Sequence, residues 1–87
     1  MKGMKVTVKL FATLGDYLPD AARRTNSLEL DVPTDTTVGG LVGRFNLPER
    51  LVHLVLVNGN YIPADERLSH RLTEGDQLAV WPPVAGG

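Results

Sequence analysis

The chain has 87 residues and no cysteine, and its nine Lys and Arg residues against ten Asp and Glu residues leave a net charge of −1. This length supports one domain with a small core, and the missing thiol excludes cysteine nucleophiles, Cys-based zinc or iron–sulfur sites and a disulfide framework. The near-neutral charge gives no footprint for nucleic acid, and no apolar run reaches signal-peptide or membrane-spanning length, so we expect a cytoplasmic protein without nucleic-acid or membrane partners.

Two alternating segments near the start predict strands. Residues 5–10 place Val6, Val8 and Leu10 on one phase and polar residues on the other, which is the period-two pattern of a half-buried strand. Residues 28–32 repeat this pattern. Between them, residues 12–18 predict a short helix and residues 20–26 a polar loop. We expect the two strands to pair as a hairpin.

A helix is predicted next, with Thr36 or Thr37 as its cap and Pro48 as its limit. Its apolar positions at helical spacing are Val38, Leu41, Val42 and Phe45. Glycines at positions 39, 40 and 43 each cost up to about 1 kcal/mol relative to alanine. We therefore expect packing on the sheet to hold this helix, with glycine tolerated because its backbone lies close to the strands.

The second half of the chain predicts three more strands. Residues 51–57 are almost continuously apolar and predict a central strand, which leads through an Asn-Gly turn at 58–59 into a short strand at 61–62. Residues 77–81 predict the last strand. This order predicts an α+β domain over residues 1–81, in which one main helix packs on one face of a mixed sheet of about five strands.

Residues 82–87 are predicted to form an extended tail after the domain. Its residues are Pro82, Pro83, Val84, Ala85, Gly86 and Gly87. The two prolines lack N–H donors and favour a stiff, polyproline-like arm. The glycine pair lacks Cβ atoms, so another protein can close around this backbone and a terminal carboxylate. A frayed terminus explains the same residues, so the pair alone leaves both interpretations open.

The polar residues assemble no catalytic group. His53 and His70 have no carboxylate at a spacing that would orient them, and the side chains of Ser69 and His70 point apart in extended chain. Glu74 and Asp76 are expected to be exposed turn charges. We predict that this chain is not an enzyme and holds no metal and no cofactor.

Three aromatic residues are predicted to share one surface. Phe11, Tyr61 and Trp81 fall on the phase opposite to the residues that face the helix. Single exposed aromatic residues are common and require no explanation. A rigid aromatic cluster near the start of the tail is nevertheless typical of an interface, and we predict a docking surface for a partner.

Four segments together resemble the MoaD/ThiS family of ubiquitin-like sulfur carriers. They are Val8-Lys9-Leu10-Phe11-Ala12, Leu56-Val57-Asn58-Gly59, Leu72-Thr73-Glu74-Gly75-Asp76-Gln77-Leu78, and Pro82-Pro83-Val84-Ala85-Gly86-Gly87. The last of these, at the end of the chain, is the most specific. The resemblance covers nearly the whole chain and implies the β-grasp (ubiquitin-like) fold.

The resemblance also implies a mechanism. An E1-like adenylating enzyme would use ATP to activate the carboxylate of Gly87, and a persulfide sulfur donor would convert it to a thiocarboxylate. In the branch that it resembles most, the tail enters the large subunit of molybdopterin synthase (MoaE-like) to deliver sulfur for the molybdenum or tungsten cofactor. Phe11, Tyr61 and Trp81 match the family's docking surface.

Other functions stay open at this point. Similar carriers supply sulfur for thiamin, cysteine or methionine. A ubiquitin-like modifier would share the adenylation step and join Gly87 to lysines of other proteins. A β-grasp binding module that acts by surface contacts alone would have a dispensable tail.

Overall fold

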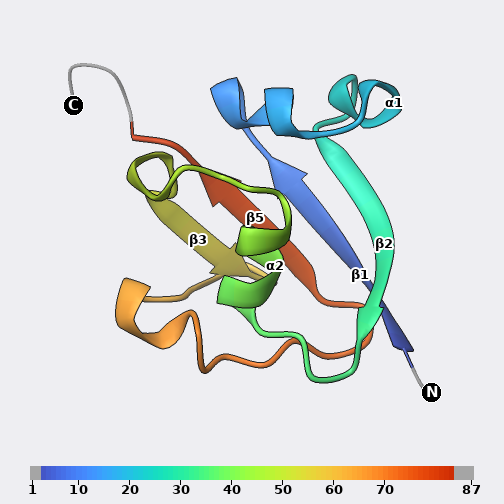
Figure 1. The fold of residues 1–87 in the computed structure, drawn as a ribbon, viewed down its shortest axis with the longest axis vertical. Helices are drawn as coiled ribbons and strands as arrows, with labels where there is room; N and C mark the ends of the chain where they lie inside the picture. The colour runs from blue at the N-terminus through green and yellow to red at the C-terminus, as the bar shows by residue number, and fades with distance from the viewer. Residues whose placement is uncertain (1–2, 84–87) are drawn as a thin grey trace.

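Five strands form one mixed sheet in the computed structural model, which describes residues 3–83 (Figure 1). The strands are β1 (Gly3–Leu10), β2 (Ser27–Pro33), β3 (Leu54–Val57), β4 (Asn60–Tyr61) and β5 (Gln77–Trp81). The helices are α1 (Asp20–Arg23) and α2 (Val38–Arg44), and the 3-10 turns are η1 (Ala12–Tyr17), η2 (Glu49–Leu51) and η3 (Ala64–Glu66).

The strands follow the order β2-β1-β5-β3-β4 across the sheet. β1 pairs with β2 antiparallel, as the hairpin prediction required, and with β5 parallel. β3 pairs antiparallel with both β5 and β4. A parallel pair needs a long crossover, which here includes α2. The predicted α+β architecture, a mixed sheet of five strands with one main helix, is confirmed.

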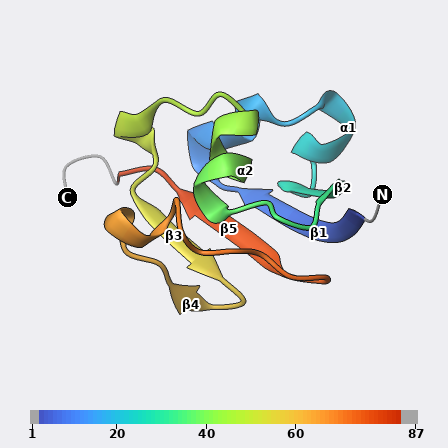
Figure 2. The same ribbon diagram turned by 60° about the horizontal axis from the view of Figure 1, so that its bottom comes forward.

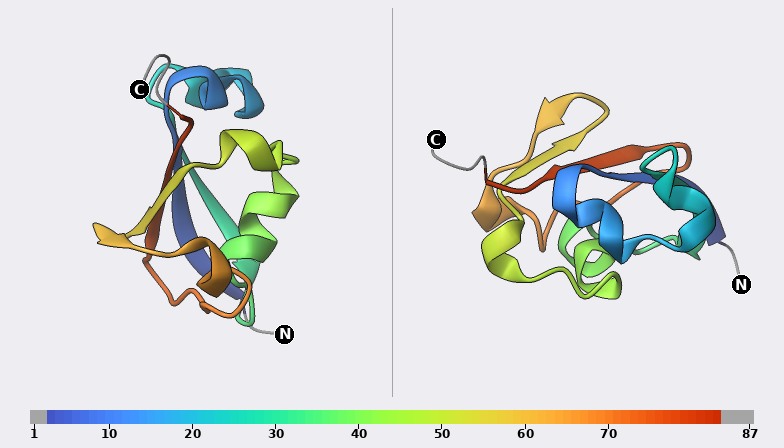
Figure 3. Two further views of the ribbon diagram at one scale, coloured as in Figure 1. Left: turned by 90° about the vertical axis from the view of Figure 1, so that its left-hand side faces the viewer. Right: turned by 90° about the horizontal axis from the view of Figure 1, so that it is seen from above.

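Within residues 3–83, all helical segments lie on one side of the sheet, and its other face carries no helix (Figures 2 and 3). We call this bare side the open face. The residues that the strands turn toward α2 are almost fully buried; they include Val6, Val8, Leu10, Val55, Leu78 and Val80. Val38 and Leu41 of α2 complete this core with no exposed surface. No helix within residues 3–83 has the length and apolar character that crossing a bilayer requires.

The prediction of a central strand over residues 51–57 is wrong in its extent. The strand begins only at Leu54, after η2, and it lies inside the sheet, paired with β5 on one side and with β4 on the other. Val55 and Val57 are buried, whereas Leu54 and Leu56 are half-buried on the open face. The apolar residues of this strand thus face two different surfaces: the valines face the core and the leucines face the partly exposed side of the sheet. The strand is not buried on both sides.

The helix α2 starts at the cap predicted for it. The Thr37 side chain accepts a hydrogen bond from the backbone N–H of Gly40 at 3.0 Å, which satisfies one of the free donors at a helix start. For Gly39, the reason for a glycine differs from the prediction. A Cβ on Gly39 would lie 2.5 Å from a methyl carbon of Leu68 and 3.3 Å from the carbonyl oxygen of Arg67, so the connector after η3, and not a strand, approaches closely.

The prediction of a polar loop over residues 20–26 is also wrong in part. Asp20–Arg23 form the single turn α1, in which Ala22 is buried and an ion pair of 3.1 Å joins Arg23 to Asp20. Arg23 also donates from Nε to the carbonyl oxygen of Leu18 at 3.0 Å. A buried alanine and an ion pair at i,i+3 spacing stabilise a turn too short to persist alone.

Candidate functional site

Phe11 and Trp81 stack face to face at the end of the sheet where the tail begins. Their ring centroids are 4.4 Å apart and their planes differ by 8°. β1 and β5 run parallel, so their last residues lie side by side, and the N–H of Phe11 donates to the carbonyl oxygen of Val80 at 3.1 Å. Both rings are half-buried. The structure thus brings together two of the three aromatic residues predicted to form a docking surface.

Tyr61 lies on the same open face but in a neighbouring row. The register aligns Lys9 with Ala79, Ala79 with Leu56, and Leu56 with Tyr61 across four strands. Residues directly opposite each other in a sheet point to the same side. The side chain of Tyr61 is therefore on the face of Phe11 and Trp81, and it is 57% exposed.

A shallow hollow of about 220 Å³ lies beside the stacked pair. It is lined by Lys9, Phe11, Leu56, Asn58, Gly59, Gln77, Ala79 and Trp81. We use the name aromatic face for Phe11, Leu54, Leu56, Tyr61 and Trp81. Sequence reasoning missed Leu54 and Leu56, because their continuous apolar run predicted a strand buried on both sides. The Asn-Gly turn could have identified them. When residues 58–59 form a two-residue turn, Tyr61 has to pair with Leu56, and alternation along β3 then places Leu54 on the same face as Leu56.

The start of the tail is fixed to the sheet through Trp81. Its carbonyl oxygen accepts a hydrogen bond from the N–H of His53 at 3.0 Å. Pro82 follows half-buried and Pro83 exposed. The remaining predicted tail residues, Val84, Ala85, Gly86 and Gly87, lie outside the described residues.

A second set of polar contacts fixes the β3–β4 turn that carries Tyr61. Asn58 and Gly59 both have positive φ, 52° and 85°, which a type I′ turn at the predicted Asn-Gly position requires. Asn58 donates from Nδ2 to Oδ1 of Asp76 at 2.8 Å, and its Oδ1 accepts from the N–H of Gln77 at 2.9 Å. The turn is thereby joined to the start of β5.

Asp76 is a buried carboxylate, which corrects its prediction as an exposed turn charge. It also accepts from the N–H of Thr73 at 2.8 Å and from the Thr73 hydroxyl at 3.1 Å. Burial raises its pKa, but the bonds from Thr73 and Asn58 and the charge of His70 together outweigh burial and hold the pKa below its ordinary value of 3.8. Hydrogen bonds to a carboxylate favour its ionised form. Asp76 therefore acts as a structural acceptor.

The other polar residues considered in the sequence do not come together. Ser69 donates from its hydroxyl to the carbonyl oxygen of Glu66 at 3.2 Å, and not to His70. The side chain of His53 is exposed. Within residues 3–83, no group of three or more His, Asp or Glu side chains is close enough to hold a metal ion.

Comparisons with solved structures show that the chain is similar to small ubiquitin-like proteins. The chain is 31% identical to SAMP1 of Haloferax volcanii over 95% of this chain and 99% of that chain, with a TM-score of 0.66. It is 26% identical to small archaeal modifier protein 1 of Methanosarcina acetivorans over the full length of both chains, with a TM-score of 0.64. These neighbours confirm the predicted β-grasp fold.

A third similar structure shares the fold at lower identity. It is a Pyrococcus furiosus protein assigned provisionally as molybdopterin converting factor subunit 1, 23% identical over 93% of this chain and 99% of that chain, with a TM-score of 0.63. Comparison with curated proteins yields no significant match. The model of the ThiS family matches residues 8–87, which includes the aromatic face, the Asp76 turn and the tail. The chain therefore belongs to the ThiS family, the MoaD/ThiS group of ubiquitin-like sulfur carriers.

Proposed function

We propose that this protein carries sulfur as a thiocarboxylate on Gly87 for the synthesis of molybdopterin. An E1-like enzyme joins the Gly87 carboxylate to the α-phosphate of ATP and releases pyrophosphate. A persulfide sulfur then displaces AMP at the carbonyl carbon, and a thiol cleaves the resulting disulfide to leave the thiocarboxylate. ATP is bound by the enzyme and not by this chain, which acts as the carrier.

The family match that runs through to Gly87 is the observation that carries this proposal. Sequence and structure add a physical reason for it. Trp81 is fixed by the hydrogen bond from His53 and by the stack with Phe11. The six residues after Trp81 begin with two prolines and end with two glycines. In a polyproline conformation, they span about 19 Å at about 3.1 Å per residue. That length is sufficient for a terminal carboxylate to reach an active site in a docked partner.

The aromatic face is the surface on which the partner docks. It combines the rigid stack of Phe11 and Trp81 with the exposed Tyr61 and the half-buried leucines of β3. Aromatic side chains fixed by packing make strong interface anchors because little conformational freedom is lost on binding. The face adjoins the start of the tail, so docking aims the tail at the partner's active site. We propose that the E1-like enzyme and the MoaE-like large subunit both use it in turn.

The assignment to molybdopterin depends on Pro82 and Pro83. A proline pair directly before the last four residues distinguishes the molybdopterin branch from the thiamin branch, as the resemblance in sequence implies. The acceptor is therefore a pterin precursor bound to the large subunit. Thiamin, cysteine and methionine pathways are the alternative recipients.

Protein modification is a second candidate function. Two similar proteins are small archaeal modifier proteins, at 31% and 26% identity over at least 95% of this chain. A modifier passes through the same adenylate, but the amine of a lysine displaces AMP and forms an isopeptide bond at Gly87. A non-covalent β-grasp module is the third candidate, and for it the tail has no role.

Mass spectrometry of the intact chain distinguishes these candidates. The protein is incubated with a candidate E1-like enzyme, ATP and a persulfide donor, with an incubation without ATP as control. We expect a mass increase that corresponds to replacement of one oxygen by sulfur, located at Gly87 by fragmentation. Adding the large subunit and the pterin precursor should return the original mass. Isopeptide-linked Gly87 without any thiocarboxylate would support the modifier, and an unchanged mass under all conditions would contradict both.

A further inference from the structure

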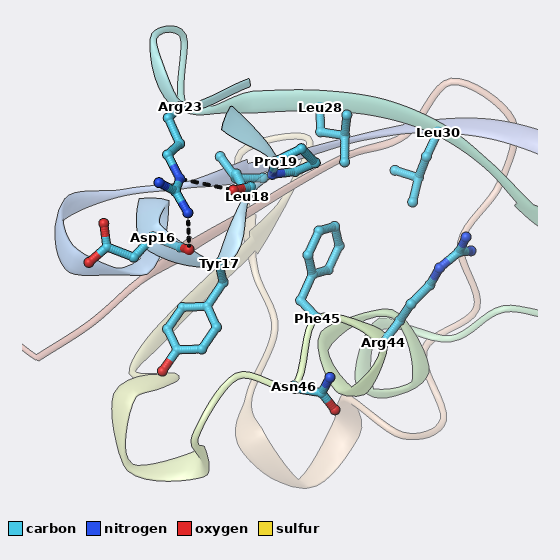
Figure 4. A pocket seen from close by; sticks show the side chains of 10 residues that line it. All are labelled: Asp16, Tyr17, Leu18, Pro19, Arg23, Leu28, Leu30, Arg44, Phe45 and Asn46. Carbon is cyan, nitrogen blue, oxygen red and sulfur yellow. Dashed lines mark hydrogen bonds between the residues drawn. The ribbon is translucent and has the colours of Figure 1, made fainter. Parts of the chain in front are cut away.

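The free edge of the sheet at β2 adjoins an open groove. β2 is the outermost strand next to β1, so one side of its backbone pairs with no other strand in the part of the chain that the structure describes. An open groove of about 590 Å³ runs along its helix side (Figure 4). We call it the β2 groove. It lies on the opposite side of the sheet from the aromatic face, so the proposed function does not use it.

The register shows which backbone groups of β2 are available. The N–H of Leu10 donates to the carbonyl oxygen of Asn26 at 3.0 Å, and the ladder continues without a break through Val8↔Leu28 and Val6↔Leu30. Hydrogen-bonded pairs alternate along an antiparallel ladder. The N–H and C=O groups of Glu29 and Asp31 therefore point away from β1, in the spacing that an additional strand needs.

The β2 groove provides apolar contacts directly beside these groups. Leu28 and Leu30 point from β2 into the groove and are half-buried, and the ring of Phe45 points toward them from the end of α2 (Figure 4). Side chains alternate between the two faces of a strand. An added strand would thus direct every second side chain into this groove, next to the leucines and Phe45.

The charged side chains near β2 differ between the two ends of the groove and between the two faces of the sheet. At the Leu30 end of the groove stands the exposed Arg44, which makes no ion pair within residues 3–83 (Figure 4). Arg23, at the other end, is already engaged with Asp20 and with the carbonyl oxygens of Asp16 and Leu18. On the open face, β2 presents the exposed carboxylates of Glu29 and Asp31; Asp31 forms a solvent-exposed ion pair of 3.9 Å with Lys5 of β1, and Glu29 makes none within residues 3–83.

These observations specify the chemistry of the partner. We propose that β2 binds an extended segment of another protein as an additional antiparallel strand. The residues of this added segment that face the groove are apolar, and an acidic residue next to Arg44 precedes them. The alternate residues of the segment are basic and lie opposite Glu29 and Asp31. Antiparallel addition is the more stable arrangement per residue, and opposite charges directly across a sheet attract.

A second copy of this chain fits the same edge poorly in the register centred on Leu30. If two β2 strands paired antiparallel about a two-fold axis at Leu30, Glu29 of each would lie opposite Asp31 of the other. Like charges directly opposite each other destabilise strand pairing. The edge therefore favours a basic-faced partner over self-association.

The test uses the full-length chain and a fluorescein-labelled peptide, Asp-Lys-Val-Lys-Val-Lys. Binding is measured by fluorescence anisotropy, and amide NMR shifts locate it. We expect saturable binding with shifts confined to β2 and the groove. The Lys residues lie opposite Glu29 and Asp31, so their N–H groups face β2. N-methylation at the Lys positions should abolish binding, while N-methylation at the Val positions should leave it intact.

Charge reversal in the protein gives an independent readout. Arg44→Glu should weaken binding about tenfold, whereas Arg50→Glu, at an exposed arginine in η2 that does not line the groove, should not. Removal of Gly86 and Gly87 should have no effect, which separates this inference from the proposed function. The proposal would be overturned if the peptide showed no saturable binding, if the NMR shifts lay on the aromatic face, or if the chain self-associated through β2. It would also be overturned if both N-methylated peptides lost binding equally, or if the two arginine variants had equal effects.

Discussion

Asn58 and Asp76, separated by 18 residues in sequence, are joined by a hydrogen bond of 2.8 Å from Nδ2 to Oδ1. The same Asn58 side chain accepts from the N–H of Gln77 at 2.9 Å. One amide therefore fixes the β3–β4 turn, which carries Tyr61, to the start of the strand that carries Trp81. The geometry of the aromatic face depends on this pair.

Replacing Asp76 should destabilise the fold strongly. Asp76→Ala removes the charged acceptor for Asn58 and for the N–H and hydroxyl of Thr73, and a hydrogen bond to a charged group contributes about 1.5–3 kcal/mol. We expect a loss of about 2–3 kcal/mol in the free energy of unfolding, measured by urea denaturation. Glu74→Ala removes only an exposed bond to the N–H of Lys5 and should cost less than about 0.5 kcal/mol. Equal losses would contradict this role of Asp76.

The lowered pKa of Asp76 predicts how stability varies with pH. A carboxyl whose pKa is lower in the folded state stabilises the fold above its unfolded pKa, near 3.8, and this contribution is lost as the pH falls through the folded pKa. The unfolding free energy of the native chain and of Asp76→Asn should therefore converge as the pH is lowered below that value. Urea denaturation between about pH 6 and pH 2 measures the difference. A constant difference would show that the ionised carboxylate contributes nothing.

The glycines of α2 should respond differently to alanine. A Cβ on Gly43 would meet no atom within 4 Å, whereas a Cβ on Gly39 would meet Leu68 and the Arg67 backbone. Gly43→Ala should raise the unfolding free energy by about 0.5–1 kcal/mol through helix propensity. Gly39→Ala should gain less or lose stability, because the connector has to move. Thermal and urea denaturation of both variants would contradict this if Gly39→Ala proved the more stable.

Tyr61 allows a test of docking without loss of the fold. Its side chain is mostly exposed, so Tyr61→Ala should change the unfolding free energy by less than about 0.5 kcal/mol. If it is an interface anchor, binding to the E1-like enzyme or the large subunit should weaken by about 2 kcal/mol, roughly 30-fold, in calorimetric titration. Leu68→Ala, at an exposed apolar side chain beside α2 that lines neither the aromatic face nor the β2 groove, is the control. Equal affinities for the two variants would remove Tyr61 from the docking surface.

Extension of the chain beyond Gly87 tests the role of the terminal carboxylate. Adding one alanine after Gly87 displaces the carboxylate from its residue and adds a Cβ, so ATP-dependent thiocarboxylate formation should fall below detection. The last strand ends at Trp81, so we expect the far-ultraviolet circular dichroism spectrum to stay unchanged. Alanine added at the amino end should retain full activity. Normal thiocarboxylate formation on the extended chain would refute the proposed chemistry.

Patterns within single strands predicted the fold well. The alternation around Val6 and Val8 identified β1 and the face on which it is buried, and Thr37 marked the start of α2. The run from Leu51 to Val57 misled because apolar side chains on a half-covered sheet face have the composition of a core. The local sequence pattern indicates which residues are apolar, but the packing of the sheet determines which of its two faces buries them.

The candidate site was predicted only in part, for a similar reason. Strand phase was sufficient to place Phe11, Tyr61 and Trp81 on one face, and the parallel pairing of β1 with β5 then set the stack. The role of Asp76 depends on Asn58, which is distant in sequence and close only after β3 and β5 pair. The β2 groove depends on the position of β2 at the edge of the sheet, which the side-chain pattern of β2 does not indicate.

The parallel pairing of β1 and β5 also determines how the protein responds to force. β5 lies between β1 and β3 and ends at Trp81 with a hydrogen bond to His53 (Figure 1). A partner that draws the tail into its active site pulls β5 along its own axis. The ladders on both sides are then loaded in shear, so their hydrogen bonds resist together and do not open one after another. Under the proposed function, this arrangement would let the domain withstand a pull applied at Trp81.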